Sequence, residues 1–324
     1  MSSSSFPLLR LPFLALREII EKIAPYEQFK LSLCSKRMHF VVKNYRCKSS
    51  MFLSLRGFEN YTNIYLISKK YLGDEVTFLV RSEGDIYCWA TYNNGEYQSG
   101  FKETDRFFSC ENTIQGTKFL VEFLCDLFAV EVEIVEVVDN TIWMLNFVEE
   151  RQGAFSYDAD VWNNNKCVRT DEQLRHILLD LNPGSLNFDQ ITSNNFRIEN
   201  FHKMYENLTI SAATWISVEN LYQLDCAELQ IHDKYFSNTD INRYLKHVLS
   251  GGAPRLREFS ADVQDPTENV IFDGIQKLLT ESERFDVEEG NWTLKGKVTR
   301  GLVLVQIDVL HFGRIFLCIK ELEE

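Results

Sequence analysis

The chain has 324 residues, more than a single domain usually holds, so two or three compact units are expected. Hydrophobic residues make up 45% and aromatic residues 13%, which is enough for a packed core and excludes a disordered composition. The formal net charge of −13 argues against nucleic acid as the main partner, because neutralising phosphates requires clustered Lys and Arg.

The first forty-five residues predict three short helices, each with one apolar face. Pro12 can open the first helix, because the first turn has no N–H partner to lose, and Pro25 ends it. The apolar residues of this helix recur at i, i+3, i+4 and i+7, as Leu16, Ile19, Ile20 and Ile23. A second helix runs from about Tyr26 to Cys34, and Ser35 caps a third that carries Met38, Val41, Val42 and Tyr45. Such a small unit must pack on the rest of the chain or on a partner to be stable.

Three segments of this region resemble an F-box: Phe6 to Pro12, Arg17 to Ile23, and Leu31 to Arg37. The region departs from the commonest pattern at Met38, where many F-boxes carry Trp, and by two extra residues after Pro12. Both departures are similar to the F-box of the large nematode-type family. A helical cap without a partner is the alternative.

The resemblance implies that a Skp-type linker protein binds this region and that a cullin scaffold is bound through the linker. It implies apolar contacts to the linker from ten residues: Leu11, Pro12, Leu14, Leu16, Ile19, Ile20, Ile23, Phe29, Leu33 and Cys34. The surplus of basic residues described below would suit the acidic character typical of Skp-type proteins.

Residues 49–165 are predicted to form an intermediate α/β region. Phe52 to Asn60 indicates a short strand, and residues 76–80 and 86–92 predict a β-hairpin around Glu83-Gly84-Asp85. A helical stripe follows at Leu120, Phe123, Leu124 and Leu127. Val130, Val132 and Ile134 then alternate with acidic residues, as in a half-buried strand.

Helix-then-strand units recur in residues 166–324. Helical stripes are predicted within residues 174–181, 218–222 and 241–248, and strands at 208–210, 229–231 and near 256–259. The first two of these strands begin 21 residues apart, a leucine-rich-repeat-like period, although the units are too few and too irregular for a solenoid. Residues 302–309 and 314–319 predict two final strands, paired antiparallel. The predicted fold class is therefore α/β (α+β), with three N-terminal helices followed by mixed helix–strand units.

Four segments of this half resemble the F-box-associated region of the same nematode-type family: Trp215 to Leu221, Leu224 to Leu229, Asp240 to His247, and Gly251 to Leu256. In that family the region is taken to recruit a target protein. Alternation along the strands should direct Thr209 and Gln230 away from the core, with Glu258 as a third candidate for target binding. Ordinary solvated strand positions are the alternative interpretation.

Charge and cysteine content add two expectations. Residues 1–50 hold nine basic and three acidic residues, a net charge of +6, which leaves −19 for the remainder. This asymmetry predicts two surfaces with different partners, although a basic helix face beside an acidic body explains it equally well. The eight cysteines form no C-x-x-C pair, and no signal peptide or membrane span is apparent, which favours a soluble intracellular protein, cytoplasmic or nuclear.

Motifs of enzyme chemistry are not found in the sequence. It contains no P-loop, no G-x-G-x-x-G, no H-E-x-x-H and no G-x-S-x-G, and the six histidines are isolated. Asp158 and Asp160 could pair as acid and base, but a solvated acidic loop is the simpler interpretation. We expect no catalytic residue, no metal site and no cofactor.

The predicted organisation is an F-box at 1–48, the intermediate region at 49–165 and a substrate-binding F-box-associated region at 166–324. This organisation predicts a non-catalytic substrate adaptor of a Skp–cullin–F-box type ubiquitin ligase, which acts by raising the effective concentration of a target. One alternative is a protein-interaction module that never joins a ligase. The other is an enzyme whose site is assembled from scattered residues.

Overall fold

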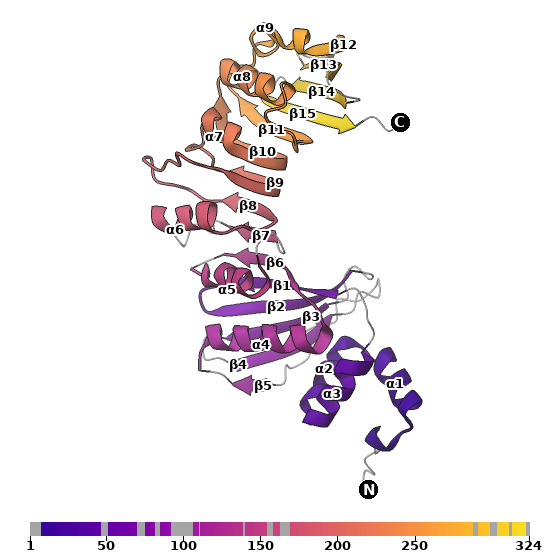
Figure 1. The fold of residues 1–324 in the computed structure, drawn as a ribbon. Helices are drawn as coiled ribbons and strands as arrows, with labels where there is room; N and C mark the ends of the chain where they lie inside the picture. Colours follow the sequence, from indigo (N-terminus) through magenta and orange to yellow (C-terminus); the bar gives the residue numbers. More distant parts are fainter. Residues whose placement is uncertain are drawn as a thin grey trace. The chain divides into compact units, whose positions relative to one another are not determined.

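The computed structural model describes most of the chain, in two compact units. The described residues are 8–46, 51–69, 75–81, 85–91, 106–109, 111–138, 140–153, 158–162, 169–287, 291–298, 303–310 and 313–321. The units span Met1–Glu136 and Val137–Glu324. Both combine helices with strands, which confirms the α/β fold class (Figure 1). The finer domain limits expected from the sequence stay predictions.

The first unit begins with a short 3-10 turn, η1 (Leu8–Arg10), and three helices, α1 (Phe13–Lys22), α2 (Pro25–Leu33) and α3 (Lys36–Tyr45). Pro12 is the N-cap residue of α1, and Pro25 is the first residue of α2, where its missing N–H costs nothing. The Ser35 side chain accepts a hydrogen bond from the backbone N–H of Met38 and caps α3. The three predicted helices and the Ser35 cap are confirmed.

A sheet follows these helices in the first unit. Its strand order is β6 (Val132–Val137), β1 (Met51–Gly57), β2 (Tyr61–Ser68), β3 (Glu75–Arg81), β4 (Asp85–Thr91) and β5 (Arg106–Ser109). Strands β3 and β4 pair antiparallel, which confirms the predicted hairpin, whose last residue, Tyr92, lies outside the described residues. The predicted helix α4 (Thr113–Phe128) contacts β2, β3 and β4 and buries Leu120, Val121 and Leu124.

The second unit is built around a run of parallel strands. In chain order its elements are α5 (Trp143–Gln152), β7 (Asp158–Val161), α6 (Asp171–Arg175), the π-helical turn η2 (His176–Asp180), β8 (Ser185–Asp189), β9 (Lys203–Ser211), α7 (Val218–Gln223), β10 (Leu224–Phe236), α8 (Asn238–Leu249) and β11 (Glu258–Val263). Strands β7 to β11 lie side by side in chain order, each parallel to the next. This is the repeat-like arrangement that the helix-then-strand pattern predicts.

Antiparallel strands complete the second unit. After α9 (Glu268–Ile271) and the 3-10 turn η3 (Ile275–Leu278) come β12 (Leu279–Val287), β13 (Asn291–Val298), β14 (Val303–Leu310) and β15 (Arg314–Glu321). Each pairs antiparallel with the next, and β15 pairs antiparallel with β11. The two predicted final strands are confirmed as β14 and β15, whereas α5, β7, β8, β12 and β13 were not predicted.

Aromatic packing fixes the segment between β8 and α7. Trp215 is 2% exposed, and its ring lies 5.4 Å from that of Phe196 and 5.8 Å from that of Phe201, both of which are fully buried. The Asn220 side-chain amide donates to the carbonyl of Ile198 at 2.7 Å, and Ser217 forms a capping box with Asn220. This segment is therefore held by both apolar and polar contacts.

Cysteine burial differs from one position to another. Cys226 is 2% exposed, and burial raises the pKa of its thiol to about 12, as expected of an unreactive packed thiol. Cys34, one of the predicted linker contacts, is instead exposed at the end of α2.

Candidate protein-interaction surfaces

The buried residues of α1–α3 join these helices to the rest of the first unit. Leu16 and Ile20 of α1 and Phe29 of α2 are buried together with Met38, Val41 and Val42 of α3. The ring of Phe29 makes T-shaped contacts with Phe78 of β3 at 4.9 Å and with Phe123 of α4 at 5.9 Å. The three helices therefore share a core with the sheet and α4.

Because of this packing, three of the ten predicted linker contacts are buried inside the first unit and do not lie on its surface. Leu16, Ile20 and Phe29 are 7%, 0% and 0% exposed, so they have almost no surface to offer a partner. Their apolar spacing indicated a contact face but could not say which neighbour covers it. The exposed members of the predicted set are Pro12, Leu14 and Cys34, and the half-buried members are Leu11, Ile19, Ile23 and Leu33.

Helices α1 and α3 nevertheless carry three large apolar side chains that this unit leaves exposed. Phe13 is 58%, Leu14 70% and Phe40 64% exposed. Single exposed apolar residues are common, but three within the three-helix region make this region a candidate interaction surface. Phe13 and Phe40 were missed from the sequence. Phe40 lies off the apolar stripe of α3, whereas Phe13 lies three residues before Leu16 and extends the stripe of α1, which was predicted to begin at Leu16.

Gln28 fixes the junction between α1 and α2. Its buried side-chain amide donates to the carbonyl oxygens of Ile20 at 3.1 Å and Ile23 at 3.0 Å. These carbonyls lie at the end of α1, where the helix has no partners of its own. The orientation of α1, which carries Leu14, is thereby fixed.

An ion-pair cluster joins α3 to α4. The Asp126 carboxylate of α4 accepts from Lys43 and lies 3.4 Å from the His39 ring nitrogen. The hydrogen bond from Lys43 is the largest cause of a lowered pKa for Asp126. The contribution of the pair to stability is therefore present at neutral pH and is lost as the pH falls through this lowered pKa.

Replacing Asp126 tests this connection. Since about half of the Asp126 side chain is exposed, Asp126→Asn is expected to lower the free energy of unfolding by at most about 1 kcal/mol at pH 7. The difference should shrink towards zero as the pH is lowered through the pKa of Asp126, in urea titrations that compare the variant with the natural chain. The matched control is Glu131→Gln at an exposed position, and an unchanged difference at low pH would contradict the assignment.

The second unit presents one face of its parallel strands that none of its described helices covers. Leu208, Leu229 and Phe259 point to the opposite face and are buried there, Phe259 against Tyr244 of α8 at 4.7 Å. Figure 1 shows α7 and α8 beside β10 and β11. The alternate residues are less buried, and we call them the helix-free face: Asp158, Asp160, Ser185, Asn187, Asp189, Asn207, Thr209, Glu228, Gln230, Glu258 and Ser260.

The three predicted target-binding residues lie on this face. Thr209 and Gln230 are neighbours in the register of β9 and β10, both half-buried, and Glu258 is exposed on β11. Their expected outward direction is confirmed, and their role in binding stays a prediction. The register neighbour of Gln230 on β11 is Ser260, which is 5% exposed and accepts a hydrogen bond from Arg314 at 2.9 Å, so it has almost no surface to offer a partner.

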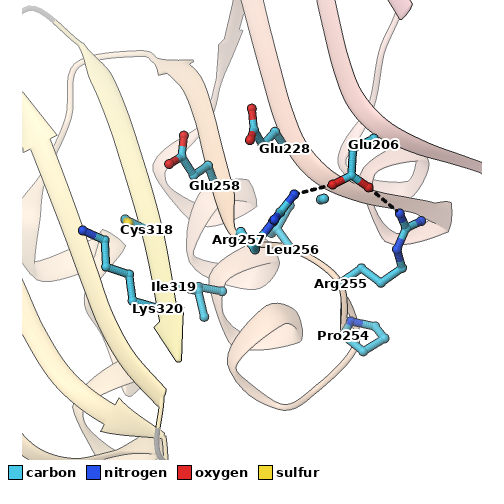
Figure 2. A pocket seen from close by; sticks show the side chains of 11 residues that line it. Glu206, Glu228, Pro254, Arg255, Leu256, Arg257, Glu258, Cys318, Ile319 and Lys320 are labelled. Atoms are coloured by element: carbon cyan, nitrogen blue, oxygen red, sulfur yellow. Dashed lines mark hydrogen bonds and ion pairs between the residues drawn. The ribbon is translucent and has the colours of Figure 1, made fainter. Parts of the chain in front are cut away.

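A groove opens at the start of β10 and β11, with a volume of about 750 Å³ (Figure 2). Its wall includes Glu228 and Glu258, which are register neighbours on adjacent strands. Across from them, Glu206 accepts hydrogen bonds from Arg255 at 2.9 Å and from Arg257. The sequence did not predict this groove, because it combines residues from β9 to β11 with the end of β15.

The described residues also lack the features of two other kinds of site. Among them, no group of three or more His, Cys, Asp and Glu residues is placed to hold a metal ion. None of the helices in the described ranges is both long enough and apolar enough to cross a membrane.

Comparison with known families identifies two domains in the chain. Residues 8–50 match the F-box domain, and residues 187–261 match the family described as F-box associated. The chain carries an F-box followed by an F-box-associated domain. This order matches the nematode-type F-box protein pattern, and the recognition made from the sequence is confirmed. No curated protein and no solved structure matches the chain.

The F-box comprises η1 and α1–α3, and the F-box-associated match runs from β8 into β11. The exposed residues Phe13, Leu14 and Phe40 belong to the first domain, and Thr209, Gln230 and Glu258 to the second. Proteins that combine these domains generally serve as substrate adaptors of Skp–cullin–F-box type ligases, and F-box proteins are generally non-catalytic.

Proposed function

We propose that this chain bridges a Skp-type linker and a target protein within a ubiquitin ligase. The exposed side chains of α1 and α3 would bind the linker, which itself binds a cullin. The helix-free face would hold the target near the ubiquitin-charged enzyme, so that catalysis comes from proximity. No chemistry by the chain itself is required.

The observation that carries the proposal is an F-box whose apolar side chains are partly left in solvent. Phe13, Leu14 and Phe40 are exposed, although the Phe13 ring contacts that of Tyr45, whereas Ile20 and Phe29 are fully buried. Each apolar side chain of this size contributes roughly 1.5–3 kcal/mol when fully buried. Three of them would supply appreciable affinity even after the entropic cost of association.

One observation favours the alternative, a protein-interaction module outside any ligase. Phe29 of the apolar stripe packs on Phe78 and Phe123 of the same chain, as expected if the F-box served only as a structural cap. The remaining exposed residues distinguish the two functions, because a structural cap has no need of Leu14 in solvent.

Co-expression of the full chain with a Skp-type protein tests the proposal. We expect the two proteins to form one complex that elutes as a single peak in size-exclusion chromatography, with both proteins in equal amounts. Separate elution of the two proteins at micromolar concentration would refute linker binding. The remaining function would then be that of a protein-interaction module outside any ligase. The full chain is required, because removal of residues 1–46 would expose Phe78 and Phe123 and confuse unfolding with loss of binding.

A further inference from the structure

The groove at the start of β10 and β11 has two walls, and the charged side chains form ion pairs on only one of them (Figure 2). On one wall, Arg255 and Arg257 share the carboxylate of Glu206, and Arg255 also lies 3.8 Å from Asp225, so both cations have acidic partners. On the other wall, Glu228 and Glu258 lie next to one another, and neither forms an ion pair with a basic residue of the described ranges. Two adjacent carboxylates that form no ion pair make this wall electronegative, and Lys320 of β15 is the cation that also lines the groove.

The same sign of charge continues along the helix-free face. All charged members of this face are acidic: Asp158, Asp160, Asp189, Glu228 and Glu258. Burial raises the pKa of Asp160 and of Asp189, and the negative charges of Asp158 and Asp233 respectively raise them further. None of these five carboxylates forms an ion pair with a basic residue of the described ranges, while Arg314 of β15 donates to Ser260 of the same face.

An aromatic side chain lies on β15, the strand that borders the acidic face next to β11. Phe316 of β15 is 39% exposed and is the register neighbour of Ser260. The guanidinium of Arg314 lies 5.5 Å from the Phe316 ring centroid, which shows that the ring already accepts a cation on one side. An aromatic ring beside carboxylates suits the long apolar stem and the charged end of Lys or Arg.

We propose that the helix-free face and its groove bind a segment of the target rich in Lys and Arg, with cations received by Glu228 and Glu258. This inference rests on the proposed function and specifies the chemistry of the target. Residues 137–324 contain 30 acidic and 18 basic residues, a net charge of −12, which attracts such a segment over a distance. An acidic or phosphorylated segment would be repelled.

A matched pair of triple variants tests the proposal in the full chain. The face variant carries Asp158→Asn, Glu228→Gln and Glu258→Gln. The control variant carries Asp273→Asn, Glu172→Gln and Glu199→Gln, which change the net charge equally at exposed positions outside the helix-free face. Binding of a fluorescein-labelled peptide of about eight lysines is measured by anisotropy at low salt, and circular dichroism verifies folding.

The face variant should bind the lysine peptide about tenfold more weakly than the natural chain, and the control variant less than twofold more weakly. Lys320→Gln removes a cation from the groove lining and should strengthen binding, which mere loss of structure would not do. Equal weakening in both triple variants would show a non-specific effect of net charge and overturn the proposal, as would no binding by the natural chain. Linker binding should be unchanged in every variant, so failure here is distinguishable from failure of the proposed function.

Discussion

Changing Leu14 to Asp is expected to weaken linker binding by about 100-fold or more while the chain stays folded. Leu14 is 70% exposed, so the substitution should change the free energy of unfolding by no more than about 0.5 kcal/mol. At the interface, the change removes roughly 1.5–3 kcal/mol of apolar burial and places an unpaired charge where water is excluded. Isothermal titration calorimetry with the purified linker measures the loss of affinity.

The matched control introduces the same charge at an exposed aliphatic residue outside the F-box. Ile191 is 66% exposed in the second unit, and Ile191→Asp should leave linker binding unchanged. Ile20 is unsuitable for this test, because it is fully buried, and a charge there would unfold the helices. Equal linker affinity for Leu14→Asp and the natural chain would place the docking surface elsewhere.

Replacing Trp215 by Ala should have the largest effect on the stability of the second unit. Removing a buried indole from between Phe196 and Phe201 leaves a cavity, and such changes cost about 3–5 kcal/mol. The melting transition of this unit should fall by roughly 10 °C for a unit of this size. Since Trp215 lies within residues 187–261, the substitution should also abolish target recruitment.

Linker binding separates this effect from general unfolding. The F-box lies in the first unit, so the Trp215→Ala variant should keep its affinity for the linker. Tyr235→Ala, at a 64% exposed aromatic residue of β10, is the control and should shift the transition only slightly. A shift for Trp215→Ala no larger than that of the control would contradict the aromatic cluster as a source of stability.

Local periodicity predicted the helices of the F-box and the units around α7 and α8. In α8 the apolar residues Ile241, Tyr244, Leu245 and Val248 share one face, and all are buried. Elements without such a pattern were missed. Strand β12, for example, is rich in charged residues, and its pairing with β13 depends on the antiparallel sheet around it.

The site was less predictable than the fold. Spacing showed that Ile20 and Phe29 belong to apolar faces, but the contacts that cover Phe29 come from Phe78 and Phe123, 49 and 94 residues further along the chain. The direction of the strand side chains, in contrast, could be predicted from the sequence. The outward direction of Thr209 and Gln230 follows from alternation alone, because one face of the parallel strands is packed under helices.

The proposed function requires one chain to hold the ligase and its target at the same time. This requirement can be tested by affinity purification of the tagged natural chain, Leu14→Asp and the Ile191→Asp control, followed by mass spectrometry of ubiquitin-modified lysines. We expect Leu14→Asp to lose the linker and cullin, to keep the target and to reduce ubiquitin on that target, while the control resembles the natural chain. Unchanged ubiquitin modification of the target in Leu14→Asp would show that the F-box surface does not bring the ligase to the target.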